Sequence, residues 1–161
     1  MLKYNIKRMS VILIIVLVMI PILLVGRGQL SLQYELNIMD QENEQVLKSK
    51  LVRQGDEIAF YWIHSVEHTS WVEIFTLEGQ QLKLQEIRLQ GFGAGIPHER
   101  GQVTRVEGGE IIMSQIDEDY ESYQWIHSHT ATEKITINGQ VFIRAGSLPH
   151  HGFMKMIIKE R

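Results

Sequence analysis

Apolar and polar side chains alternate with a period of two through most of the chain after residue 28. Leu30, Leu32, Tyr34, Leu36 and Ile38, for example, are separated by single polar residues, which is the pattern of a half-buried β-strand. Similar runs, some of them short, cover 46–54, 58–63, 72–77, 82–89, 110–114, 123–129, 135–137, 141–143 and 153–159. No segment after residue 28 combines a helical period with capping residues, so the pattern predicts an all-β domain.

Two of the predicted connections have the composition of tight hairpin turns. Glu78-Gly79-Gln80 separates two strands, and Asn138-Gly139-Gln140 separates two more, with Asn-Gly being the stronger signal. The residues around these turns also match at a spacing of 60, from Glu73 to Gln80 and from Glu133 to Gln140. We therefore expect about eight to ten antiparallel strands, arranged as a β-sandwich or a partly open barrel.

The front of the chain has a different pattern. Residues 9–25 contain a single polar side chain, Ser10, and would span about 26 Å as a helix. Lys3, Lys7 and Arg8 precede this run, which predicts that the N-terminus faces the cytoplasm. We expect a cytoplasmic basic stub at 1–8, a transmembrane anchor at 9–25 and an extracytoplasmic β-domain at 28–161. A cleaved signal peptide is the alternative, although no small-x-small cleavage site follows.

Composition narrows the classes of partner and chemistry. The chain contains no cysteine, so the domain folds without disulfides and has no thiol nucleophile or thiolate metal ligand. From residue 28 onward there are 12 Lys plus Arg against 19 Asp plus Glu, a formal charge of −7. A surface with this charge repels nucleic acid, which we exclude as a partner.

Three stretches concentrate the residue types that bind ligands. The first, 61–75, contains two Trp, two His and two Glu; a shorter version of it recurs at 125–130, and a glycine-rich loop lies between them at 91–97. Such a loop can present successive backbone N–H groups to an anion, and the tryptophans can form an apolar wall. The candidate ligand-binding residues are His64, Ser65, Glu67, Glu73, Gly93, Gly95, His127 and His129.

Strand geometry constrains how these residues can meet. In an extended strand His64 and Glu67 point to opposite faces, so they can share a site only if a turn begins after Ser65. His127 and His129 would lie on the same side of a strand, and their spacing suits two ligands of one metal ion. A zinc site with His64, His127 and His129 as candidate ligands is therefore an alternative to a site without a cofactor.

One combination of residues resembles a known family. Trp62-Ile-His-Ser-Val-Glu67, then Val72-Glu73-x-Phe75 and Gly93-Ala-Gly-Ile-Pro97 are similar to the bacterial domain of unknown function DUF1850, and the similarity is clearest from Leu30 to Pro97. The resemblance implies a small exported or membrane-anchored protein that accompanies TRAP-type transporters of the TAXI kind. It brings no established chemistry with it.

We therefore expect a membrane-anchored binding or accessory domain that assists TRAP-type uptake of a small organic anion, rather than an enzyme. Its partners would be the membrane, through the N-terminal helix, and a transporter subunit. Two alternatives remain. The first is a metal-dependent hydrolase with histidine ligands and Glu67 or Glu73 as general base. The second is a structural partner within a membrane complex, which would present an exposed apolar patch.

Overall fold

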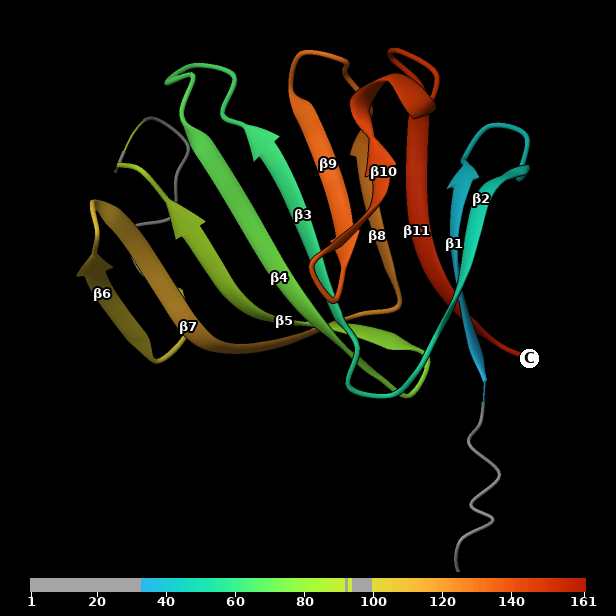
Figure 1. Cartoon of the computed structure of the whole chain (residues 1–161), viewed down its shortest axis with the longest axis horizontal. Coiled ribbons are helices and arrows are strands. Elements are labelled where there is room, and N and C mark those ends of the chain that lie inside the picture. The colour runs from blue at the N-terminus through green and yellow to red at the C-terminus, as the bar shows by residue number, and fades with distance from the viewer. Residues whose placement is uncertain (1–32, 92, 94–99) are drawn as a thin grey trace, which may run out of the picture. The chain divides into compact units, whose positions relative to one another are not determined.

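The computed structural model describes residues 33–91, 93 and 100–161, which form two antiparallel β-sheets packed on each other (Figure 1). The smaller sheet has four strands in the order β2-β1-β11-β8. Its strands are β1 (Tyr34–Asp40), β2 (Val46–Val52), β8 (Ser122–Ile126) and β11 (Phe153–Glu160). Because β1 pairs with β11 in continuous register, the two ends of the described domain lie side by side, with Tyr34 opposite Glu160.

The larger sheet has seven strands in the order β10-β9-β3-β4-β5-β7-β6. They are β3 (Glu57–Ile63), β4 (Ser70–Glu78), β5 (Gln81–Leu89), β6 (Val103–Glu107), β7 (Glu110–Tyr120), β9 (Thr132–Ile137) and β10 (Gln140–Arg144). A single turn of 3₁₀ helix, η1 (Ala145–Ser147), follows β10. The strand β3 lies near the middle of this sheet, with the two predicted hairpins on either side, β4–β5 and β9–β10.

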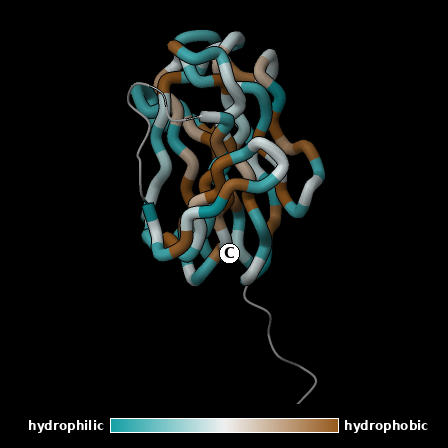
Figure 2. The backbone as a smooth tube through the Cα atoms, turned by 90° about the vertical axis from the view of Figure 1, so that its left-hand side faces the viewer, coloured by the Kyte–Doolittle hydropathy of each residue, from teal (hydrophilic) through white to brown (hydrophobic). Residues whose placement is uncertain are grey.

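The core lies between the facing sides of the two sheets. Leu36, Ile38 and Met156 from the smaller sheet and Phe60 and Phe75 from the larger one are fully buried there. Hydrophobic and hydrophilic segments alternate along the strands in Figure 2, as expected when every second side chain points inward. The predicted all-β sandwich is therefore confirmed.

Several details of the prediction were wrong. The two sheets are separate, so the domain is not a partly open barrel, and the described residues form eleven strands rather than eight to ten. The strand β6 was missed because all five of its side chains are exposed, which leaves no burial pattern to detect. The strand β8 ends at Ile126 instead of His129, because the chain enters a turn in which the Thr132 N–H donates to the Ser128 carbonyl at 2.9 Å.

Two sequence predictions fall on residues that the structure does not describe. The anchor at 9–25 lies outside the described part, as does most of the loop 91–97, of which only Gly91 and Gly93 are placed. Within residues 33–91, 93 and 100–161, no helix has the length and apolar character needed to cross a bilayer.

One end of the sandwich gathers the histidines. The strands β3 and β8 finish there and β4, β9 and β11 begin there, so their connections at 64–69, 127–131 and 148–152 are neighbours (Figure 1). These connections carry His64, His68, His127, His129, His150 and His151. We call this the histidine end of the domain.

Candidate functional site

A tight turn at the end of β3 brings His64 and Glu67 together. The His64 carbonyl accepts from the His68 N–H at 2.9 Å, and the His64 N–H donates to the Thr69 carbonyl at 2.8 Å. The Glu67 backbone N–H then donates to His64 Nδ1 at 3.1 Å. Since Nδ1 accepts this bond, the neutral ring carries its proton on Nε2. The turn after Ser65 that the sequence required is therefore present, and it fixes His64 as a hydrogen-bond donor.

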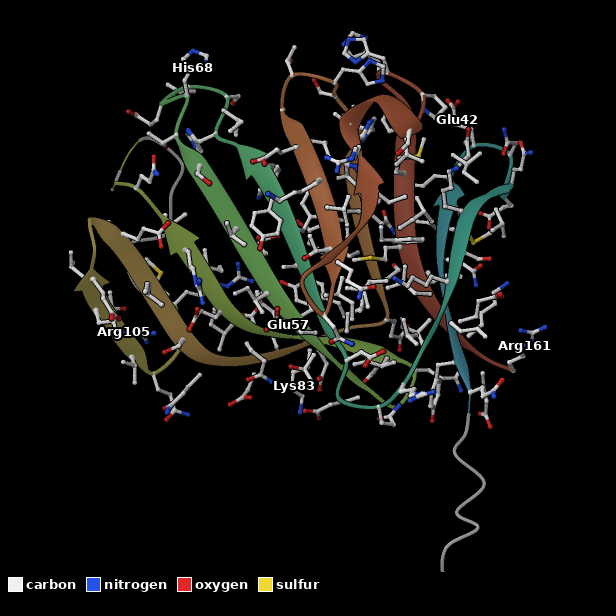
Figure 3. The ribbon with its side chains drawn as sticks, viewed as in Figure 1. Glu42, Glu57, His68, Lys83, Arg105 and Arg161 are labelled. Carbon is white, nitrogen blue, oxygen red and sulfur yellow. The ribbon has the colours of Figure 1, made fainter. Side chains whose placement is uncertain are left out.

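A pocket of about 320 Å³ lies beside this turn, lined by Trp62, Ile63, His64, Ser65, Trp71 and Ala131. The His64 ring stacks on the Trp71 ring with centroids 5.9 Å apart and planes 6° from parallel. Trp62 and Trp71 are directly opposite each other on β3 and β4, with ring centroids 5.5 Å apart. A volume of this size is at the small end of the range for small-molecule sites. In Figure 3 the labelled His68 belongs to the same turn, which lies at the opposite end of the domain from Glu57 and Lys83.

The glycine-rich loop touches this turn at Gly93. A Cβ atom built on Gly93 would lie 2.6 Å from Glu67 Cδ, closer than any real contact. Only a glycine therefore allows the loop backbone to approach the Glu67 side chain this closely. Gly95 lies outside the described residues.

Glu73 is not part of the pocket wall. It lies on the inner face of β4 opposite Phe60, with only 6% of its surface exposed. The Tyr123 hydroxyl, on β8 of the other sheet, donates a hydrogen bond to Glu73 Oε2. Burial raises the pKa of the Glu73 carboxyl, while the Tyr123 hydrogen bond and the positive charge of Arg100 act in the opposite direction. Burial and the carboxyl of Glu73 likewise raise the pKa of Tyr123.

Arg100 belongs to a neighbouring polar group at the end of β7. Its guanidinium donates to the Glu118 carboxylate and, at 2.8 Å, to the Tyr120 hydroxyl. The hydrogen bond from Arg100 lowers the pKa of Glu118. The cation whose charge acts on Glu73 is therefore already paired with another carboxylate.

His127 is a fully buried structural residue. Its Nε2 lies 2.7 Å from the Ala145 carbonyl, and the Trp125 indole N–H donates to its Nδ1 at 3.4 Å. Because a carbonyl only accepts, Nε2 carries the proton and both ring nitrogens have partners. Burial lowers the pKa of His127, and the neighbouring His129 adds to this effect.

The remaining histidines tie two loops together. His129 Nε2 lies 2.9 Å from the Leu148 carbonyl, and the His129 backbone N–H donates to His150 Nδ1 at 3.1 Å. The His150 ring stacks on the His129 ring with centroids 4.7 Å apart, and the centroids of the His150 and His151 rings are 3.7 Å apart. Desolvation, assisted by the charges of His151, His129 and His127, lowers the pKa of His150. His150 and His151 are both exposed, and no pattern in the sequence predicted these contacts.

These bonds bear on the zinc alternative. No group of three or more His, Asp or Glu side chains in the described part of the chain is arranged to hold a metal ion. His127 has no free ring nitrogen, and His129 directs its Nε2 to a carbonyl. The described residues therefore offer no ready zinc site. Glu67 lies in an exposed turn and Glu73 in the buried core, so these two carboxyl groups do not form a catalytic pair.

Seven of the eight predicted residues fall into three groups, and the eighth, Gly95, lies outside the described residues. His64, Ser65 and Glu67 share the turn beside the pocket, where Gly93 approaches Glu67; His127 and His129 lie on the loop that leads to Ala131 of the pocket wall; Glu73 lies on the same strand face as Trp71. Sequence reasoning missed Tyr123, Arg100 and Ala131. No local signal could have found Tyr123, because it is fifty residues from Glu73 and in the other sheet.

Comparison with known proteins identifies the family. The family model described as "Domain of unknown function (DUF1850)" matches residues 58–142, more than half of the chain. The match includes the second tryptophan-histidine stretch and most of the second hairpin, beyond the segment to Pro97 where the resemblance was clearest. Neither the curated proteins nor the solved structures gave a match. The chain belongs to the DUF1850 family.

Proposed function

We propose that this protein is a membrane-anchored binding module that holds a small organic anion in the pocket between Trp62, Trp71 and His64. The observation that carries the proposal is the orientation of His64. Its Nδ1 accepts the Glu67 N–H, so the remaining ring proton on Nε2 is left to serve a ligand. The Ser65 hydroxyl is a second donor in the pocket lining, and the two indole rings supply an apolar wall.

None of the described residues that line the pocket is a carboxylate, although Glu67 lies on the adjoining turn. Neutral N–H and O–H donors can bind a carboxylate without a cationic partner, because hydrogen bonds to a charged acceptor are stronger than those between neutral groups. In this proposal Glu67 and Gly93 form the rim of the pocket. His127 and His129 hold the loop that ends at Ala131 in position.

We further propose that residues 9–25 anchor the domain in the membrane and that the domain lies on the extracytoplasmic side, where it assists TRAP-type uptake as a partner of a transporter subunit. This part rests on the apolar run after Lys3, Lys7 and Arg8 and on the family resemblance. Because the chain has no cysteine, single cysteines can test it. A membrane-impermeant maleimide should label Gln80→Cys but not Lys3→Cys in intact cells, and the reverse result would refute this topology.

Binding can be measured with the full-length chain in detergent. We expect at least one member of a panel of acetate, lactate, succinate and benzoate to raise the melting temperature and to give a saturable heat in calorimetry. His64→Ala and Ser65→Ala should weaken this binding about tenfold or more, since a hydrogen bond to a charged group contributes about 1.5–3 kcal/mol.

His68→Asn is the matched control. His68 lies on the same turn, does not line the pocket and has a positive φ of 53°, which asparagine tolerates. The control variant should bind the acid as the wild type does. If no acid binds, or if His64→Ala binds normally, the proposed function is wrong.

A second candidate, a structural partner in a membrane complex, is favoured by one observation. Ile126 and Phe153 are opposite each other on β8 and β11, on the outer side of the smaller sheet, and are 61% and 45% exposed. For this candidate, cross-linking in native membranes should give a product of defined size that is lost in the Ile126→Ser, Phe153→Ser double variant. Unchanged cross-linking in that variant would exclude this surface.

A further inference from the structure

Glu73 is an unexpected residue for its position. The side chains on the same face of β4 are Trp71, Phe75 and Leu77, which all belong to the core or pack against it. A carboxylate at this position loses its water and costs free energy that an apolar side chain would not. The Tyr123 hydrogen bond offsets part of that cost. A perturbed, buried carboxyl of this kind is typical of a functional group.

Trp71 connects Glu73 to the pocket. It is two residues before Glu73 on the same strand face, and its ring forms part of the pocket wall. The Trp71 indole N–H also acts on the carboxyl and lowers the Glu73 pKa slightly. Its geometry falls short of a hydrogen bond, so this buried N–H has no bonded partner among the described residues. A charge in the pocket would therefore be separated from Glu73 by about one indole ring.

The groups around Glu73 do not neutralise it. Tyr123 from β8 donates the one hydrogen bond to the carboxyl that the described residues provide. Arg100 acts on Glu73 only through its charge and is bonded to Glu118 and to the Tyr120 hydroxyl. Phe60, opposite Glu73 on β3, is apolar. A second negative charge nearby would therefore act on a carboxyl that has no cationic partner of its own among the residues that the structure describes.

We infer that Glu73 takes up a proton when an organic acid enters the pocket, so that the anion is bound together with one proton. This inference rests on the proposed function. At a pH where the Glu73 carboxyl of the free protein is ionised, it accepts a proton from the buffer on binding, forming an O–H bond, and the bound state gains no net charge from the ligand. Proton uptake and ligand affinity are then linked reciprocally.

The linkage gives the sign of the pH dependence. The bound anion disfavours the ionised form of Glu73, so the pKa of the carboxyl is higher in the complex than in the free protein. Between these two values the affinity should increase as the pH falls, approaching about tenfold per pH unit for one linked proton. Above both values the anion binds to the ionised protein with its lowest affinity.

The test is isothermal titration calorimetry with the full-length chain in detergent and the tightest-binding acid of the panel. We would use benzoate first, because its ring matches the indole walls. The measured heat of acid binding at one pH differs between phosphate, imidazole and Tris buffers only if binding exchanges protons with the buffer. Across the titration range of Glu73, the slope of heat against buffer ionisation enthalpy should approach one proton taken up per acid bound.

Glu73→Gln should reduce this slope to near zero and make the affinity independent of pH. Glu133→Gln is the matched control, because Glu133 has the same place in the repeated hairpin sequence but is exposed and paired with Lys134. It should keep the wild-type slope. Tyr123→Phe removes a hydrogen bond that lowers the Glu73 pKa, so it should move the whole pH profile to higher pH. It therefore tests the inference if Glu73→Gln fails to fold.

The outcomes separate the two proposals. Acid binding with no buffer dependence, or with the same slope in Glu73→Gln, would overturn the inference and leave the pocket as proposed. A profile that Tyr123→Phe does not move would also overturn it. If no acid binds to the wild type, the proposed function fails and this inference fails with it.

Discussion

Tyr123 on one sheet donates a hydrogen bond to Glu73 on the other, so that a polar contact joins the two layers within the aromatic part of the core. The Tyr123 ring packs against Phe60 and Phe75, with centroids 5.4 and 5.1 Å apart. Glu73 is thereby held among rings that exclude water.

This contact predicts the pH dependence of stability. Burial raises the pKa of Glu73 above its value in the unfolded chain, so the protonated carboxyl favours folding. Its contribution is full below the unfolded-state pKa and is lost as the pH rises through the folded-state pKa. Glu73→Gln has no such loss. The free energy of unfolding of the variant, relative to wild type, should therefore increase between pH 4 and pH 7.5 in urea titrations, and a constant difference would contradict the assignment.

His64 and His127 should differ in their effect on stability, although both occur in a Trp-Ile-His-Ser sequence. His127→Ala removes bonds to Ala145 and Trp125 and leaves a buried space, so we expect a loss of about 2–4 kcal/mol in the free energy of unfolding. His64→Ala lies in a partly exposed turn and should cost less than about 1 kcal/mol. Denaturant titration of both variants measures this difference, and equal losses would argue against separate roles.

The approach of Gly93 to Glu67 predicts a coupled pair. Gly93→Ala places a methyl group where the exposed Glu67 side chain now lies, so that side chain has to change its rotamer, which should cost about 0.5–1.5 kcal/mol. In a Glu67→Ala background that side chain is absent, and the cost should largely disappear. A double-mutant cycle on unfolding free energies should give a coupling of at least about 0.5 kcal/mol, whereas additive effects would mean that the two residues do not touch.

Asn138 joins two turns at the end of the domain opposite the histidines. Its side-chain amide donates to Asp56 and its oxygen accepts from the Glu57 backbone N–H, each at 2.9 Å. Its φ of 49° is also one that asparagine tolerates better than most residues. Asn138→Ala should destabilise the domain by about 1–3 kcal/mol, as measured by urea unfolding. Acid binding at the opposite end should be unchanged, so a loss of binding would reveal a global effect.

The hydrophobic pattern identified most strands because alternation reports directly which side chains point inward. Both hairpin turns were also predicted, since Gly79 and Gly139 have the positive φ values that such turns require. The strand β4 shows the limit of this reasoning. Val72 and Ile74 on its outer face are as apolar as Trp71 and Phe75 on its inner face, so the sequence could not say that Glu73 points into the core.

By itself, the sequence determined the all-β class, the hairpins and the residues of the His64 turn, because these depend on neighbours within a few positions. It also predicted the anchor at 9–25, which lies outside the described residues. Only the tertiary structure decided that His127 is a buried structural residue, that Tyr123 meets Glu73 and that Ala131 completes the pocket. Those relationships join segments from different strands, and only the register of the strands and the packing of the two sheets bring them together.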